Sequence, residues 1–103
     1  MGMFVYSVSV SVDLNVEEDW LNWMQKTHIP EVMETGYFLA HEFFKVLLNR
    51  EEGIVTYSIQ YRFAEMKDLQ LYQAKEAPQL QAKHLERYGD KCVAFRTVLE
   101  KIN

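Results

Sequence analysis

Three histidines are the residues of this sequence best suited to acid–base chemistry, and His28 is the one placed where a pocket can form. An imidazole titrates near neutral pH, so a histidine facing a pocket can accept a proton during a reaction. His28 precedes Pro30, and a helical break at proline leaves backbone groups free and gives room for a ligand. We therefore take His28 as a candidate general base. The alternative is that its ring bonds a free backbone carbonyl and only holds the break.

Aromatic residues at strand and helix spacing are the second group that can serve a ligand. An apolar pocket with a few polar tips is typical of small-molecule sites. The same spacing is also typical of a plain core, in which buried tyrosines only need partners for their hydroxyls. The predicted pocket lies on the helix side of a sheet, and its candidate residues are Tyr6, Trp20, Trp23, His28, Tyr57 and Tyr61.

A third group combines arginines with small hydroxyl residues on strands. Alternation along the strands predicts that Arg62 and Arg96 lie on the sheet face opposite the helices. A guanidinium binds carboxylate or phosphate with two parallel hydrogen bonds, so these residues are candidates for an anion site. The alternative is that they pair with acidic residues across a dimer interface. The candidate residues of this dimer face are Ser7, Ser9, Ser11, Ser58, Arg62 and Arg96.

Other catalytic chemistries find little support. His28, His41 and His84 come from three separate segments without ligand spacing, so we predict no metal site. Cys92 is the only cysteine, which excludes a disulfide within one chain and is typical of a structural thiol. Glycine-rich phosphate loops, serine-hydrolase elbows and paired cysteines are all missing from the sequence, and we predict no cofactor.

Strands account for much of the scaffold that must position these residues. Alternating apolar residues predict strands over residues 3–12 and 54–63, each with one apolar face meeting the helices. Residues 37–48 have β-forming residues on both faces, which predicts a strand buried on both sides for part of its length. A polar run over residues 49–53 ends in glycine and predicts a hairpin loop. Residues 91–101 alternate again and predict the last strand.

The first helix is predicted over residues 16–35. Asn15, followed three residues later by Glu18, is typical of a helix N-cap with a capping box. Pro30 interrupts the pattern, and a residue before proline is disfavoured in helical geometry, so Ile29 should leave it. We therefore expect a kinked or two-piece helix.

A second helix is predicted over residues 65–88, kinked near Pro78 and stopped by Gly89. The resulting order is strand, helix, strand, strand, helix, strand. This order is typical of the α+β, ferredoxin-like βαββαβ fold, with a four-stranded antiparallel sheet and two kinked helices on one face. The mixed face of small hydroxyl and apolar residues left bare predicts a homodimer, formed by pressing two such faces together or closing them into a barrel.

Composition bounds the remaining possibilities. The 103 residues predict one domain, residues 1–103, because there is no room for a second core. A net charge of −4 argues against nucleic acid as a partner, and no apolar run is long enough to span a membrane. The N-terminus lacks the features of a signal peptide, so we expect a cytoplasmic protein. Whether Met1 and Gly2 are native stays open.

Several segments together resemble an uncharacterised bacterial family, known as domain of unknown function 4286. The segments are WLNWM (20–24), HIP (28–30), VTYSIQY (55–61), APQL (77–80), HLERYG (84–89) and VAFRT (93–97). More distantly, the tryptophan-rich first helix ending in His-x-Pro is similar to dimeric α/β-barrel proteins, including monooxygenases of the antibiotic-biosynthesis type. The resemblance implies a ferredoxin-like protomer and a side-by-side dimer, and it brings no established activity or catalytic residue.

Taken together, these observations predict a small homodimeric domain that binds a small apolar or aromatic ligand between sheet and helices. The alternative is a cofactor-independent enzyme of the small monooxygenase or isomerase type, with His28 as general base.

Overall fold

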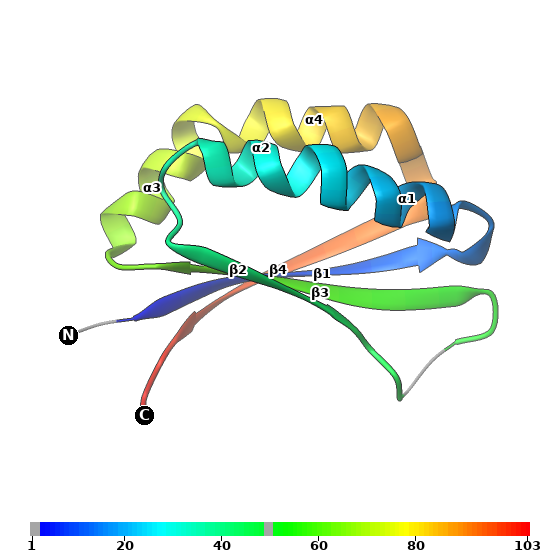
Figure 1. The fold of residues 1–103 in the computed structure, drawn as a ribbon, viewed down its shortest axis with the longest axis horizontal. Helices are drawn as coiled ribbons and strands as arrows, with labels where there is room; N and C mark the ends of the chain where they lie inside the picture. The colour runs from blue at the N-terminus through cyan, green and yellow to red at the C-terminus, as the bar shows by residue number, and fades with distance from the viewer. Residues whose placement is uncertain (1–2, 49–50) are drawn as a thin grey trace.

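In the part of the chain that the structure describes, a strand, a helical segment, two strands, a second helical segment and a last strand follow one another (Figure 1). The computed structural model describes residues 3–48 and 51–103. Met1 and Gly2 lie outside these described residues, as do Asn49 and Arg50 of the predicted hairpin loop. The elements are β1 (Phe4–Asp13), α1 (Glu17–Trp23), α2 (Ile29–Glu34), β2 (Ala40–Lys45), β3 (Ile54–Phe63), α3 (Met66–Lys75), α4 (Ala77–Tyr88) and β4 (Cys92–Glu100).

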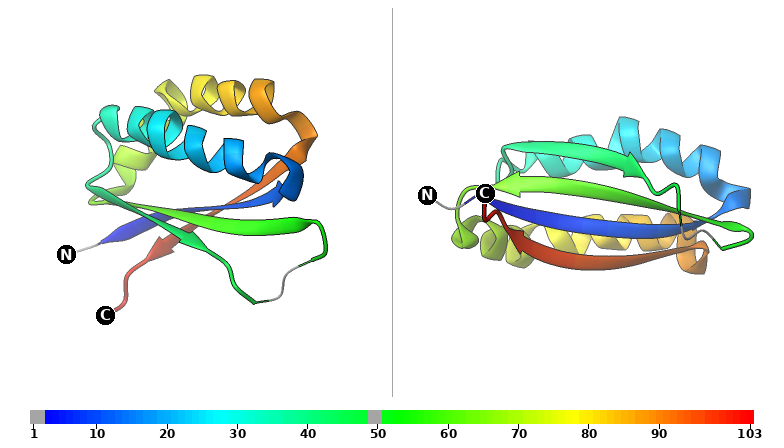
Figure 2. Two further views of the ribbon diagram at one scale, coloured as in Figure 1. Left: turned by 45° about the vertical axis from the view of Figure 1, so that its right-hand side comes forward. Right: turned by 90° about the horizontal axis from the view of Figure 1, so that it is seen from below.

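The four strands form one antiparallel sheet in the order β2-β3-β1-β4, with all the helices on one face (Figures 1 and 2). This is the ferredoxin-like βαββαβ arrangement, and the predicted fold class is confirmed. The apolar faces of the central strands β1 and β3 pack against the helices, as expected. Viewed from below in Figure 2, no described helix covers the opposite face of the sheet.

The first helical segment runs without a break from α1 through a π-helical turn, Met24–His28, into α2. The expectation that Ile29 leaves helical geometry is wrong, because its φ of −61° and ψ of −44° are helical. Its N–H bonds to the carbonyl of Met24, five residues earlier. Pro30 then stands in the first turn of α2, where its missing N–H costs little. The π turn thus allows the helical segment to continue through Pro30.

The predicted N-cap of this helix is also wrong. A short 3₁₀ turn, Leu14–Val16, precedes α1, and the carboxylate of Asp13 accepts a hydrogen bond of 2.8 Å from the backbone N–H of Asn15. Val16 stands at the N-cap of α1 without a side-chain bond. The side-chain cap is therefore Asp13, at the start of the 3₁₀ turn, and not Asn15, which the capping-box pattern had indicated.

Strand β2 corrects the prediction for residues 37–48. It is shorter, covering Ala40–Lys45, and it is mostly exposed instead of buried on both faces. The reason is its place at the edge of the sheet, where it pairs with β3 alone. Phe38, which precedes the strand, is buried and packs against the rings of Tyr61 and Tyr72.

The second predicted helix is present as two pieces, α3 and α4, that meet at Glu76, two residues before Pro78. Gly89 ends α4 with φ of 55° and ψ of −131°, a conformation open to glycine and almost no other residue. Its role as a helix stop is confirmed. The turn after Gly89 leads directly into β4, an edge strand of the sheet, and α4 lies over this side of the sheet (Figure 2, right).

Candidate functional site

A cavity of about 60 Å³ lies between the sheet and the helices. Its apolar lining residues are Val8, Val10, Met24, Val32, Ile59, Leu80 and Ala94. Its polar side chains are Tyr6, His28, Tyr61, Tyr72, Gln81, His84 and Arg96. Small-molecule sites combine apolar walls with convergent polar groups, and this lining has both in equal number.

Gln81 on α4 and Arg96 on β4 are the exposed residues of this lining, whereas the other lining residues are buried or half-buried. These two side chains therefore mark the mouth of the cavity, at the seam between α4 and β4. An engineered cavity of roughly 150 Å³ holds benzene, so the present space suits a few waters or a small aliphatic group.

His28 lines the cavity from the π turn of the first helical segment. Its ring stacks on Trp23, with centroids 5.0 Å apart, and meets His84 edge-on at 5.9 Å. Its Nδ1 atom is buried and has no hydrogen-bond partner among the described residues. The alternative in which this nitrogen bonds a carbonyl at the break is therefore not observed. Burial, followed by the neighbouring His84, lowers the pKa of His28 to about 4, so the ring is neutral at pH 7.

His84, considered above only as a metal ligand, lies beside His28. Its Nε2 accepts a hydrogen bond of 3.0 Å from the indole N–H of Trp20, so the neutral ring carries its proton on Nδ1. Burial, and then the charge of Arg96, lowers the pKa of His84. His41 lies apart, exposed on β2. Within residues 3–48 and 51–103 no group of three histidine, cysteine or acidic side chains is placed to hold a metal ion.

Three tyrosines supply hydroxyl groups to the cavity. Tyr6 lies between Tyr61 and Tyr72, with ring centroids 6.3 and 6.1 Å away. Burial raises the pKa of all three phenols, and for Tyr6 the nearby Arg96 opposes that rise. The hydroxyls therefore stay protonated at neutral pH and can donate hydrogen bonds.

Arg96 is the main correction to the predicted site. The register pairs Arg96 with Val8 of β1, and Val8 lies on the helix side of the sheet with Tyr6 and Val10. Arg96 therefore faces the cavity and not the bare face. The sequence pattern divided β4 correctly into two alternating faces. It assigned them to the wrong sides of the sheet, because the face with Val93 and Phe95 was expected to meet the helices. On this edge strand the apolar residues Val93 and Phe95 point away from the helices and are exposed.

Half of the predicted pocket residues line the cavity, namely Tyr6, His28 and Tyr61. Trp20 is fully buried in the core instead, against Tyr57 at 5.2 Å. The Tyr57 hydroxyl donates to Glu17, which ties β3 to α1. Trp23 lies on the outer side of His28, under the guanidinium of Arg87 at 5.7 Å. The rings of Trp20 and Tyr57 thus fill space between helix and sheet, which is the core alternative stated above.

Four polar lining residues were not predicted as pocket residues: Tyr72, Gln81, His84 and Arg96. Gln81 and His84 are three residues apart on α4 and so share a helix face, which is the signal that was available. Tyr72 falls on the buried face of α3, beside Leu69. Cys92 is buried, and burial raises its thiol pKa to about 11, which disfavours the nucleophilic thiolate.

The bare face of the sheet carries the remaining dimer-face candidates. Ser7, Ser9, Ser11, Ser58 and Arg62 pair across the strands on this side, away from the helix-facing residues. The hydroxyls of Ser11 and Thr56 lie 3.3 Å apart. Exposed apolar side chains flank the serines, and they are Phe44, Val93, Phe95 and Leu99. The face is thus a polar centre with apolar margins.

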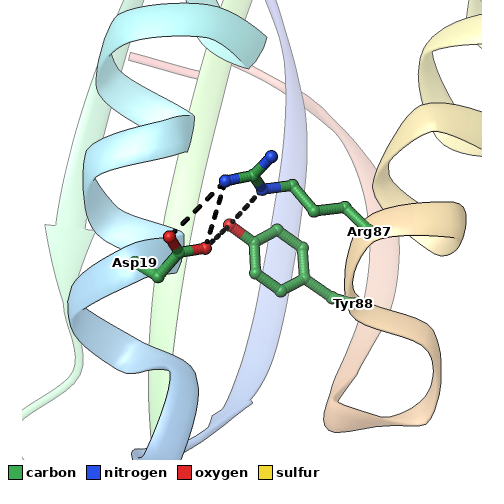
Figure 3. A network of polar contacts seen from close by, with 3 residues as sticks. All are labelled: Asp19, Arg87 and Tyr88. Carbon is green, nitrogen blue, oxygen red and sulfur yellow. Dashed lines mark hydrogen bonds and ion pairs between the residues drawn. The ribbon is translucent and has the colours of Figure 1, made fainter.

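A polar network on the outer surface joins α1 to α4 (Figure 3). The Tyr88 hydroxyl donates to the Asp19 carboxylate at 2.8 Å, and Arg87 Nε donates to the Tyr88 oxygen at 3.1 Å. Arg87 also lies 3.4 Å from the Asp19 carboxylate. The network links α1 to α4, and none of its three residues lines the cavity.

Comparison with known families and structures agrees with this architecture. The family model described as Domain of unknown function (DUF4286) matches residues 3–102. Comparison with curated proteins gave no match. No helix in the described parts of the chain is long and apolar enough to cross a membrane.

Three solved structures illustrate the shared fold. A dimeric ferredoxin-like protein from an uncultured marine organism is 13% identical, with 98% of this chain and 95% of that chain covered and a TM-score of 0.69. A putative antibiotic biosynthesis monooxygenase from Nitrosomonas europaea is 10% identical, with 97% and 90% covered and a TM-score of 0.69. An ethyl tert-butyl ether D (EthD) family protein from Bacillus halodurans is 10% identical, with 96% and 99% covered and a TM-score of 0.72. At these identities the likeness shows the fold alone.

Proposed function

We propose that this chain, which belongs to the DUF4286 family, is a homodimeric domain that binds a small molecule in the cavity between its sheet and helices. The observation that carries the proposal is the buried, unpartnered Nδ1 of His28 in the wall of that cavity. A buried polar atom without a hydrogen bond costs about 1–3 kcal/mol, and a bound molecule that offers this nitrogen a hydrogen-bond partner recovers that cost. The proposal treats residues 1–103 as one functional domain.

The size of the cavity restricts the ligand. A volume of about 60 Å³ is less than half of the roughly 150 Å³ that accommodates benzene. A small, mostly aliphatic molecule fits as the side chains stand. An aromatic ring, which the sequence analysis also allowed, enters only if Gln81 and Arg96 at the mouth move aside.

The second candidate is a cofactor-independent enzyme with His28 as general base. Its support is a neutral imidazole facing the cavity, beside a second imidazole, in a fold shared with a protein named as a putative antibiotic biosynthesis monooxygenase. A general base works best when its pKa lies near the operating pH, whereas the pKa of His28 is about 4. Such a ring is always free to accept a proton but is a weak base. Binding is therefore the function we favour.

The dimer in this proposal forms through the bare face of the sheet. Its support is the exposed apolar margin of that face and the description of a structural neighbour as dimeric. The test is solution mass by light scattering over a range of concentrations. We expect wild type and Leu85→Lys to have twice the chain mass and Phe95→Lys to have the mass of one chain. The two residues are similarly exposed, at 66% and 67%, but Leu85 lies on α4 and Phe95 on the sheet. A wild-type monomer at all concentrations would overturn the dimer.

The binding function is tested by NMR titration of the ¹⁵N-labelled protein with short-chain acids, amides and alcohols and with phenol. We expect saturable shifts at residues around the cavity for at least one of these compounds. Ala94→Met places a longer side chain in the cavity and should abolish the shifts. Val93→Met, on the opposite face of the same strand, should retain them and is the matched control. If no compound shifts the cavity residues, the binding function is wrong.

The enzyme alternative makes a separate prediction for His28→Ala. A catalytic His28 can be lost with the fold nearly intact, while turnover stops. If the variant instead melts several degrees lower and still binds the compound found in the titration, His28 has a structural role. We propose the cytoplasm as the compartment, because the free thiol of Cys92 needs no oxidising environment.

A further inference from the structure

We infer that the ligand of this cavity is a short-chain monocarboxylate, with its carboxylate on Arg96 at the mouth and its aliphatic tail in the apolar interior. This inference rests on the proposed binding function and names the class of ligand. Three features support it: the position of Arg96, the hydrogen-bond donors among the other lining residues, and the size and apolar residues of the cavity.

The charge at the mouth is the first step. Arg96 is the only lysine or arginine in the cavity lining, and the lining contains no carboxylate. The chain as a whole has fifteen acidic and eleven basic residues. An excess of basic residues therefore does not explain why an arginine without an acidic partner lines the cavity. Ion pairs elsewhere join Lys45 to Glu17, Lys83 to Glu31 and Arg87 to Asp19. Arg96 has no such partner among the described residues.

The guanidinium of Arg96 faces inward, toward the polar groups of the cavity. Arg96 lines the same cavity as Tyr6, Tyr72, His28 and His84, and its positive charge acts on the pKa of all four. These four side chains come from β1, α3, the π turn and α4. The cavity lining therefore brings one cation together with polar side chains from four different elements.

Hydrogen-bond donors are available among the other polar lining residues. The phenol groups of Tyr6 and Tyr72 stay protonated, and the His84 ring carries its proton on Nδ1 because Nε2 accepts from Trp20. A carboxylate has two oxygens and about four lone-pair sites, so it can accept from the guanidinium and from a hydroxyl together. A cationic ligand would instead meet Arg96 at the only exposed end of the cavity.

The interior behind Arg96 defines the rest of the ligand. Val10, Val32 and Leu80 are among the apolar residues of the lining, and the lining contains no second lysine or arginine. A second carboxylate would be buried unpaired, which is costly, so the ligand carries one charge. Scaling from the roughly 150 Å³ that holds six benzene carbons, about 60 Å³ holds two or three carbons. Propanoate and butanoate are therefore the acids of the right length.

The test is an NMR titration of the full chain at pH 7 with butanoate, with butanamide as the neutral analogue and with succinate as the dicarboxylate. We expect butanoate to bind about tenfold or more tightly than butanamide, because charge-assisted hydrogen bonds are stronger than neutral ones. Raising the salt concentration from 0.01 to 1 M should weaken butanoate and leave butanamide unchanged. Succinate should bind more weakly than butanoate.

Arg96→Gln should remove the preference for butanoate over butanamide. Arg62→Gln is the matched control, because Arg62 is exposed on β3 on the other face of the sheet. Arg96→Lys keeps the charge without the planar fork and should retain part of the preference, which guards against an uninformative loss of folding in the glutamine variant. Melting temperatures of the three variants establish that they are folded.

Each outcome separates this inference from the proposed function. Equal affinity for butanoate and butanamide, or a preference that survives Arg96→Gln, overturns the monocarboxylate and leaves the binding function standing. Binding of phenol or an alcohol with no binding of butanoate also overturns it. If no compound of the wider panel binds, the binding function fails as well. A charge preference lost in Arg96→Gln and kept in Arg62→Gln supports the inference.

Discussion

Replacing His28 by glutamine should remove a large part of the pH dependence of folding stability between pH 6.5 and pH 4. The pKa of His28 is about 4 in the folded protein and 6.5 in an unfolded chain. Between these values the unfolded chain binds a proton that the folded protein does not bind. The free energy of unfolding therefore falls as the pH drops through this window, and the stabilising effect is fully present above pH 6.5.

The size of the effect follows from the same two values. A pKa lowered from 6.5 to about 4 corresponds to a stability difference of about 3 kcal/mol, an upper value because the ring keeps some exposure. The groups acting on His28 are His84, Glu31, Arg96 and Lys83, and all of them remain in the variant. The difference between the wild-type and variant curves therefore isolates His28. His84, whose pKa is also lowered, contributes in the same direction to both proteins.

The assay is urea unfolding followed by tryptophan fluorescence at several pH values from 4 to 7. Protomer concentration is held constant, because association makes apparent stability depend on concentration. His41→Gln is the control for losing one histidine, since His41 is exposed on the edge strand β2. We expect the wild-type stability to fall by about 3 kcal/mol more than that of His28→Gln across the window. A difference no larger than that of the control would refute the burial argument.

Three further predictions concern single contacts. Gly89→Ala should lower the unfolding free energy by about 1–3 kcal/mol in urea titrations, because alanine must adopt a glycine conformation, although its Cβ meets nothing within 4 Å; no loss would contradict the stop at Gly89. His84→Phe should cost about 1–3 kcal/mol at pH 7 by leaving the indole N–H of the fully buried Trp20 unpartnered, and His84→Gln should restore part of it; equal losses would contradict this role. Arg87→Gln should change the melting temperature by only a few degrees, since the Arg87–Asp19 pair is exposed and exposed ion pairs contribute little to stability; a loss as large as that of His84→Phe would contradict this.

The fold could be predicted where burial follows periodicity. In β3 every second residue from Val55 to Phe63 is buried, and this alternation is visible in the sequence. The breaks at Pro78 and Gly89 follow from local backbone chemistry and were also predicted. In the edge strands β2 and β4 the alternation of residue types predicts burial less well, because one side of each strand borders solvent. For this reason the burial of β2 was overestimated and the faces of β4 were exchanged.

The site could be predicted only in part, because it depends on which helix meets which strand. Tyr6, His28 and Tyr61 were identified from chemistry and spacing, and they do line the cavity. Trp20 and Tyr57 have the same character but pack against each other at 5.2 Å, and no sequence pattern distinguishes the two cases. Arg96 joins the site through pairing of β4 with β1, residues about 90 positions apart in the chain. Such a long-range register is decided by packing and not by local spacing.

The π turn at residues 24–28 has a consequence for comparing members of this family. A π turn holds one residue more than an α turn, and one residue corresponds to about 100° of rotation around a helix. Deleting one residue within this turn would rotate all of α1 relative to α2. The cavity-lining residues outside the π turn would keep their identity. The partnership between Trp20 on α1 and His84 on α4 would then be lost. Relatives that keep both histidines but lack this extra residue are therefore expected to have a different cavity, so the length of the first helix is a better marker of a shared ligand than the histidines themselves.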